Sequence, residues 1–125
     1  MNNQSPEQLF DLSYLNQVFQ GNQEMINNII QLFLQQVPEY ITEMEVCVEG
    51  DDLLALHPLA HKAKSSVTML GLRSMESNIL EIERKSKAHL ELATLPGLVS
   101  DVRSECEIVM TQLKGILQDS GVVNT

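Results

Sequence analysis

The chain has 125 residues and carries 17 acidic against eight basic side chains, a formal net charge of −9. That length is typical of one domain with one core, and a 43% hydrophobic content favours a folded globule over a disordered chain. The net negative charge, together with only two Tyr, three Phe and no Trp, argues against a nucleic-acid binder, which needs clustered cations or stacking rings.

Other protein classes are excluded by local features. The longest apolar runs are far shorter than the ~20 residues of a membrane span, and the first residues lack the positive charge and apolar segment of a signal peptide. Cys47 and Cys106 are single and distant, which favours a reducing compartment. We therefore expect a cytoplasmic protein in which both cysteines act as small buried apolar side chains.

The charge is distributed unevenly along the chain. Residues 1–60 contain nine acids and no Lys or Arg, whereas residues 61–125 contain eight of each sign. Such a separation of acidic from basic residues gives information about the partners that a protein binds rather than about its fold. Six of the bases fall between residues 61 and 87: Lys62, Lys64, Arg73, Arg84, Lys85 and Lys87.

The first predicted element is a short N-terminal helix. Residues 5–8 resemble a capping box with Pro at the first helical position, and Asp11 is a competing cap. Gly21 can end this helix in a left-handed conformation, and Asn22 can cap the next one. The apolar positions of the short helix are Leu12, Leu15, Val18 and Phe19.

Two longer helices are predicted next. The first ends at Gly50, and Pro38 inside it predicts a kink or a brief break. The second begins at the acidic pair 51–52, is interrupted by Pro58 and ends at Gly71. Apolar residues recur at spacings of three and four, as in a bundle seam: Ile26, Ile29, Phe33, Val37, Tyr40 and Met44, then Leu56, Ala60, Ala63, Val67 and Leu70.

The last two predicted helices show the same spacing. The fourth frays toward residues 88–89, residues 94–97 form a loop or an N-terminal turn, and the tail from residue 119 frays. The seam positions are Leu72, Met75, Ile79 and Ile82, then Leu95, Val99, Val102, Cys106, Val109, Leu113 and Ile116. We predict an all-α fold, an antiparallel up-down-up-down four-helix bundle with a short extra N-terminal helix.

A polar stripe runs beside the seam of the third helix. Because His61 follows seam residue Ala60, it is rotated by ~100° from the core direction and should be exposed. Considered by itself, each residue of this stripe is most often an ordinary solvated surface residue. Its members are His57, His61, Lys64, Ser65 and Thr68.

Residues 59–72, taken together, resemble the motif of the histidine-containing phosphotransfer (HPt) domain family. The resemblance extends over about residues 10–118, which implies one HPt-like domain over residues 1–125. Ala63 replaces the family's usual Leu, and Ser65 replaces a Gly thought to leave room for the partner's approach. The matching positions are His61, Lys64, Ser66 and Gly71.

The resemblance implies a phosphocarrier of a multistep phosphorelay, without autonomous catalytic activity. His61 would take a phosphoryl group from one receiver-domain aspartate and pass it to another, with receivers of hybrid histidine kinases and response regulators as partners. An imidazole is nucleophilic near neutral pH, and phosphoryl transfer depends on positioning and charge stabilisation. Lys64 would offset phosphoryl charge and Ser65 would add a hydrogen bond. No cofactor is expected, since Mg²⁺ would come with the partner.

Further residues complete the predicted site. Glu83 lies 22 residues after His61 on the next helix, at a position where the family often has Gln or Glu; we expect it to accept from Nδ1 and leave Nε2 as nucleophile. We expect a monomer that docks receivers transiently, helped by charge steering. The candidate docking residues are Leu12, Leu15, Leu59, Lys62 and Lys87.

Two other functions stay open. The first is a helical interaction module, a degenerate HPt protein that is not phosphorylated. The second is a metal site on His57 and His61, which have the i, i+4 spacing of helical zinc ligands, although Pro58 stands where a zinc protease needs Glu. An independent enzyme is disfavoured, since neither a Gly-rich nucleotide loop nor a Ser/His/Asp set is recognisable.

Overall fold

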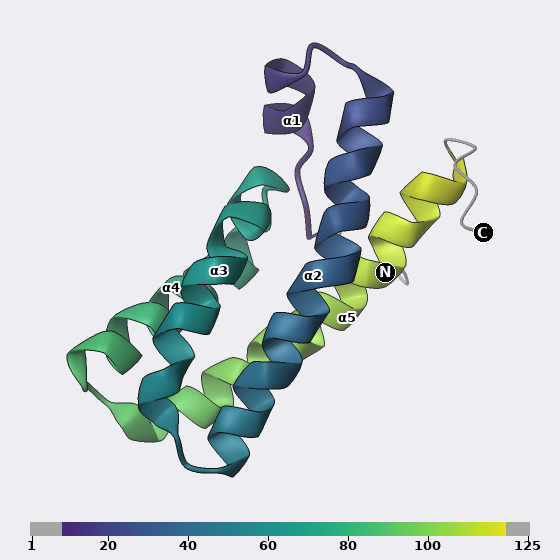
Figure 1. Cartoon of the computed structure of the whole chain (residues 1–125). Helices are drawn as coiled ribbons and strands as arrows, with labels where there is room; N and C mark the ends of the chain where they lie inside the picture. Colours follow the sequence, from purple (N-terminus) through teal and green to yellow (C-terminus); the bar gives the residue numbers. More distant parts are fainter. Residues whose placement is uncertain (1–8, 120–125) are drawn as a thin grey trace, which may run out of the picture.

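The computed structural model describes residues 9–119, and within that range it is all helical, with no strand (Figure 1). The predicted capping box at residues 5–8 lies outside the described residues, as do residues 120–125. The elements are α1 (Ser13–Val18), α2 (Gln23–Glu49), the 3₁₀ turn η1 (Leu53–Ala55), α3 (Leu56–Met69), α4 (Arg73–Ala88), the 3₁₀ turn η2 (Leu92–Thr94) and α5 (Leu95–Asp119). The part of the chain that the structure describes contains no helix with the length and hydrophobicity of a membrane crossing.

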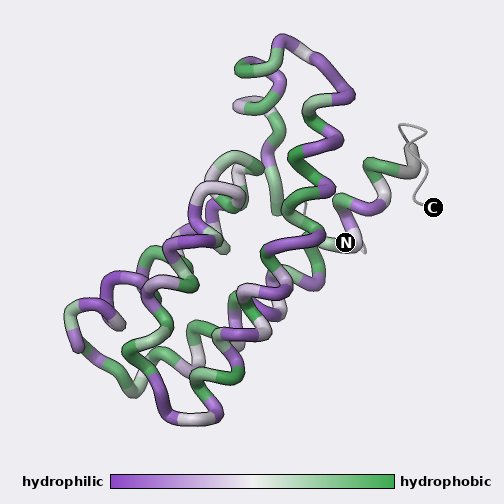
Figure 2. The backbone as a smooth tube through the Cα atoms, in the orientation of Figure 1, coloured by the Kyte–Doolittle hydropathy of each residue, from purple (hydrophilic) through white to green (hydrophobic). Residues whose placement is uncertain are grey.

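Within residues 9–119, the four long helices enclose one hydrophobic core. Helices α2 and α4 each pack against both α3 and α5, so the contacts form a closed ring. Hydrophobic and hydrophilic residues alternate along each of them in the manner of amphipathic helices (Figure 2). The short α1 lies beyond the end of α3, beside the start of α2 (Figure 1).

The predicted seams of α3 and α4 are confirmed, because every residue assigned to them is buried. On α2 the fully buried positions include Ile30 and Ile41, while Ile29 and Tyr40 are only partly buried. On α5, Leu117 is fully buried and the predicted Ile116 is not. The buried stripe of a helix is broad enough that neighbouring apolar positions compete for its centre.

Several helix ends differ from prediction. Helix α2 continues through Pro38, so of the predicted kink or break the break is wrong; packing of its buried face compensates for one missing backbone hydrogen bond. Helix α3 begins at Leu56 rather than at residues 51–52, because Asp51 has a positive φ of 56° and a 3₁₀ turn follows. Pro58 therefore lies in the first turn, where a missing N–H is tolerated.

The remaining predicted ends are present only in part, because the N-cap of α1 is Leu12 rather than Asp11 and α1 ends at Val18, before Gly21. The Asp11 carboxylate accepts from the Ser13 N–H at 2.9 Å, and the Asn22 side chain accepts from the Met25 N–H at 3.2 Å. Gly21 is left-handed, with a φ of +76°. Thr94 is the last residue of the 3₁₀ turn η2, and residues 95–97 begin α5, so the predicted N-terminal turn starts at Leu95.

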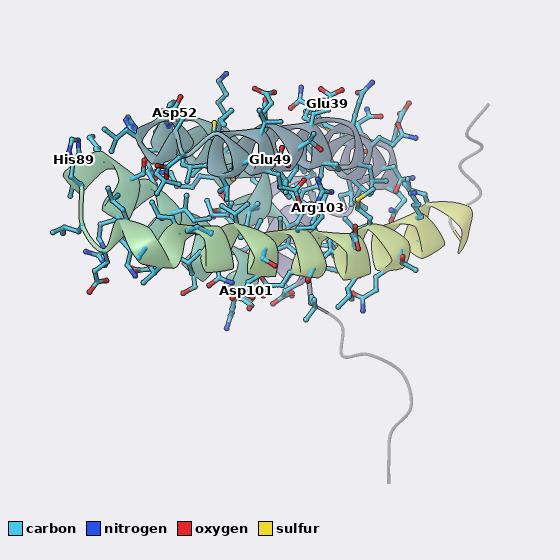
Figure 3. All side chains as sticks on the ribbon, turned by 90° about the horizontal axis from the view of Figure 1, so that it is seen from below. Glu39, Glu49, Asp52, His89, Asp101 and Arg103 are labelled. Carbon is cyan, nitrogen blue, oxygen red and sulfur yellow. The ribbon has the colours of Figure 1, made fainter. Side chains whose placement is uncertain are left out.

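An ion pair joins α5 to α2 on one side of the bundle. The Arg103 guanidinium donates to both carboxylate oxygens of Glu45, at 2.9 Å each, and to the Thr42 hydroxyl at 2.9 Å. Figure 3 shows Arg103 between these two helices. The hydrogen bond from Arg103 lowers the pKa of Glu45, which keeps the pair charged.

The cysteines differ in their surroundings. Cys106 is fully buried as predicted, and burial raises the pKa of its thiol to about 11. Cys47 is only partly buried, so the expectation of a buried side chain holds for Cys106 alone.

Candidate functional site

His61 is held outward on a rigid support. It follows Ala60, which is completely buried in the seam of α3, and its own side chain is 66% exposed. A helix fixed by such a buried stripe holds the imidazole at a defined place on the surface.

Glu83 of α4 contacts this imidazole as predicted. Its Oε2 atom lies 2.8 Å from His61 Nδ1, and the carboxylate is 19% exposed, beside the fully buried Ile82. An ionised carboxylate can only accept hydrogen bonds, so Nδ1 carries the proton in this contact. The lone pair of the neutral ring is then on Nε2.

Glu83 also binds the predicted lysine. The Lys64 ammonium lies 3.3 Å from Glu83 Oε1, so one carboxylate holds His61 with one oxygen and Lys64 with the other. Burial by itself would raise the pKa of Glu83, but the hydrogen bonds from His61 and Lys64 outweigh it and bring the pKa below its ordinary value. Glu83 therefore remains charged at neutral pH and can hold both partners.

His61 lines an open groove of about 630 Å³, called here the His61 groove. The other residues from α3 are Lys64, Ser65, Thr68 and Met69, and the remaining lining comes from Asp11, Tyr14, Gly71, Arg73 and Glu76. Ser65 is exposed in this groove, at the position where the motif has Gly. The Thr68 hydroxyl is bonded to Glu76 at 2.7 Å, which links α3 to α4 further along the groove.

The predicted apolar docking patch is wrong in two of its three residues. Leu15 is 0% exposed and Leu59 is 8% exposed, so both belong to the core and neither offers a surface to a partner. Leu12 is partly buried against the core. The residue that sequence reasoning missed is Tyr14, which is 55% exposed and lines the His61 groove. Its position next to Leu15 on a short amphipathic helix was the available signal.

The six bases of residues 61–87 do not form one basic rim. Arg84 binds Glu81, and the largely buried Lys85 ammonium binds both Glu81 and Glu91. Arg84 and Lys85 are therefore neutralised locally. Lys62 and Lys87 are exposed, and Arg73 lines the His61 groove, so these cations face a partner. The half-buried Lys64 also lines the groove, but its ammonium is bound to Glu83.

The alternative metal site on His57 and His61 has no third ligand among the described residues. Among the described residues, no group of three or more His, Cys, Asp or Glu side chains is placed to hold a metal ion. His57 is partly buried, one turn before His61, and its backbone N–H donates to the Ser86 hydroxyl at 3.1 Å.

Comparison with known protein families shows to which family this chain is related. A family model described as Hpt domain matches residues 28–119, most of α2 and all of α3, α4 and α5. The chain belongs to the Hpt domain family. Hpt domains are the phosphotransfer modules of His–Asp phosphorelays, and they interact with receiver domains. Searches of curated proteins and of solved structures found no significant match.

Proposed function

We propose that this protein is a phosphocarrier of a multistep phosphorelay, with His61 as its phosphorylated residue. The observation that carries the proposal is an exposed imidazole whose Nδ1 is bonded to an ionised carboxylate, which leaves Nε2 as the nucleophile. The donor and the acceptor are aspartates of receiver domains, in hybrid histidine kinases and in response regulators.

The transfer step follows from this geometry. The Nε2 lone pair attacks the phosphorus of an aspartyl phosphate; the N–P bond forms, the P–O bond breaks, and its electron pair stays on the aspartate carboxylate. No proton has to leave, because the ring proton is on Nδ1. The positive charge that develops on the ring is offset by Glu83 at 2.8 Å. Transfer to the second receiver is the same step in reverse.

The neighbouring groups supply charge rather than acid–base catalysis. Lys64 is one turn from His61 and can offset charge on the phosphoryl group, and Ser65 can donate a hydrogen bond to it. We propose no cofactor and no autonomous activity for this chain, with Mg²⁺ brought by the receiver. We also propose that the protein is a cytoplasmic monomer with one domain over residues 1–125. We propose an up-down-up-down order for its long helices, and the short connections between them support this order.

The test is phosphotransfer from a phosphorylated receiver to the full chain and to His61→Gln. We expect label on the wild type only, and we expect it to be acid-labile, as a phosphoramidate is. Equal, acid-stable labelling of both proteins would refute the assignment of His61. A wild type that no receiver labels would favour the non-phosphorylated interaction module.

A further inference from the structure

We propose that Gly71 positions the N-terminal segment, residues 9–19, as one wall of the His61 groove, and that Tyr14 on this wall selects among receiver domains. This inference rests on the proposed phosphocarrier function. It assigns to α1 and to the turn between α3 and α4 a task distinct from the chemistry at His61.

The contact between Gly71 and the segment leaves no room for a side chain. Gly71 has a φ of +65°, a left-handed conformation that favours glycine. A Cβ atom there would lie 2.4 Å from the Asp11 carbonyl oxygen and 2.9 Å from its backbone nitrogen. Because the obstacle is backbone, the segment would have to move. The Asp11 N–H also donates to the Leu70 carbonyl at 2.9 Å, so the segment is joined to the turn by its main chain.

The segment is anchored on both sides of this contact. Phe10 and Leu15 are buried in the core, and the Leu9 N–H donates to the Gln112 side chain at 3.2 Å. Burial of two large apolar side chains holds the backbone between them against the bundle. The contact at Gly71 therefore decides how closely the wall approaches α3.

The anchored segment presents Tyr14 to the same groove as the reactive imidazole. Asp11 and Tyr14 form the N-terminal side of the groove, and His61 and Met69 lie on α3. A receiver that brings its aspartate to Nε2 must cover this groove, because His61 itself lines it. Its acidic phosphorylation site faces His61 and Lys64, and an apolar side chain beside that site packs on Tyr14 and Met69. Aromatic anchors of this kind dominate the energetics of small interfaces.

The wall lies outside the residues that the family model matches, which begin at residue 28. The His61–Glu83–Lys64 contacts lie within them. A change in the wall can thus alter partner choice while the contacts that orient the imidazole stay in place.

The experiment separates docking from chemistry. The full-length chain is first phosphorylated with phosphoramidate, a small donor that requires no docking, and the donor is removed. Several purified receiver domains are then added one at a time, and loss of phosphohistidine is followed for the wild type, Tyr14→Ala, Tyr14→Phe and Gly71→Ala. Val18→Ala is the matched control, since Val18 is an exposed residue of α1 that does not line the groove.

We expect Tyr14→Ala to slow transfer about fivefold or more to some receivers and less than about twofold to others, which changes the ratio of rates between receivers. Tyr14→Phe keeps the ring and should retain the wild-type ratios, as should Val18→Ala. Gly71→Ala should change the ratios in the same direction, and hydrogen exchange of the Asp11 amide should accelerate as its bond to Leu70 is lost. If Gly71→Ala does not fold, Tyr14→Ala still tests whether the wall selects among receivers.

Two outcomes would overturn the inference alone. Unchanged rates for Tyr14→Ala would show that no receiver contacts the ring, and equal slowing toward every receiver would show that the wall does not discriminate. Failure of the wild type to accept phosphate from phosphoramidate, or to pass it to any receiver, would instead refute the proposed function and this inference with it.

Discussion

Ser86→Ala should destabilise the bundle because it removes the partner of two backbone groups, one in η1 and one in α3. Ser86 is buried on α4, and its hydroxyl donates to the Leu53 carbonyl at 2.8 Å and accepts from the His57 N–H at 3.1 Å. It thereby holds η1 and the first turn of α3 against α4, about one turn from both His61 and Glu83. Alanine would leave a partly buried donor and a partly buried acceptor without this partner.

The magnitude follows from these two lost bonds. Each partly buried group costs about 1 kcal/mol when its partner is removed, so the free energy of unfolding should fall by about 2 kcal/mol. In a domain of this size that corresponds to a drop in Tm of roughly 8 °C.

Urea unfolding followed by circular dichroism measures the change as a lower midpoint at constant slope. Ser100→Ala is the control, because Ser100 is exposed on α5, and it should change stability by less than about 0.5 kcal/mol. A comparably small loss in Ser86→Ala would show that water replaces the hydroxyl and would refute the reasoning.

Three further predictions concern charge. Lys64→Ala and Lys87→Ala should each slow phosphotransfer, and the effect should be largest at low salt, because added salt screens the electrostatic steering by these charges. If both variants transfer phosphate at the wild-type rate at low salt, these cations have no role in steering. The pKa of Glu83 is lowered by folding from its ordinary value of 4.5, so its contacts stabilise the protein above that pH and lose this contribution as pH falls through the lowered pKa. The difference in unfolding free energy between wild type and Glu83→Gln should accordingly shrink between about pH 6 and about pH 3, and a constant difference would count against the ion pairs. Arg103→Ala removes a bidentate pair with Glu45 that is partly exposed and should reduce the unfolding free energy by up to about 1 kcal/mol, measured by urea unfolding; an unchanged midpoint would mean that solvation of the separated charges offsets the pair.

The His61–Glu83 contact was within reach of sequence reasoning for a geometric reason. Two neighbouring helices joined by a tight turn bring residues at similar distances from the turn to face each other. His61 lies ten residues before Gly71 and Glu83 lies twelve after it, and both follow a seam residue directly. Spacing, together with the resemblance to the HPt family, therefore placed them on adjoining edges of α3 and α4, and the 2.8 Å contact is present.

The sequence by itself determined the features that repeat along one helix: the all-helical fold, the buried seams of α3 and α4, and the outward direction of His61. These follow from the helical period, which relates residues three or four apart. Only the tertiary structure decided that Leu15 is buried and Tyr14 exposed, and that Lys85 is bound to Glu81 and Glu91. Burial depends on what covers a residue, and the covering segment is often far away in the chain. Asp11 against Gly71 is the clearest case, because their contact is set by main-chain positions that no side-chain pattern encodes.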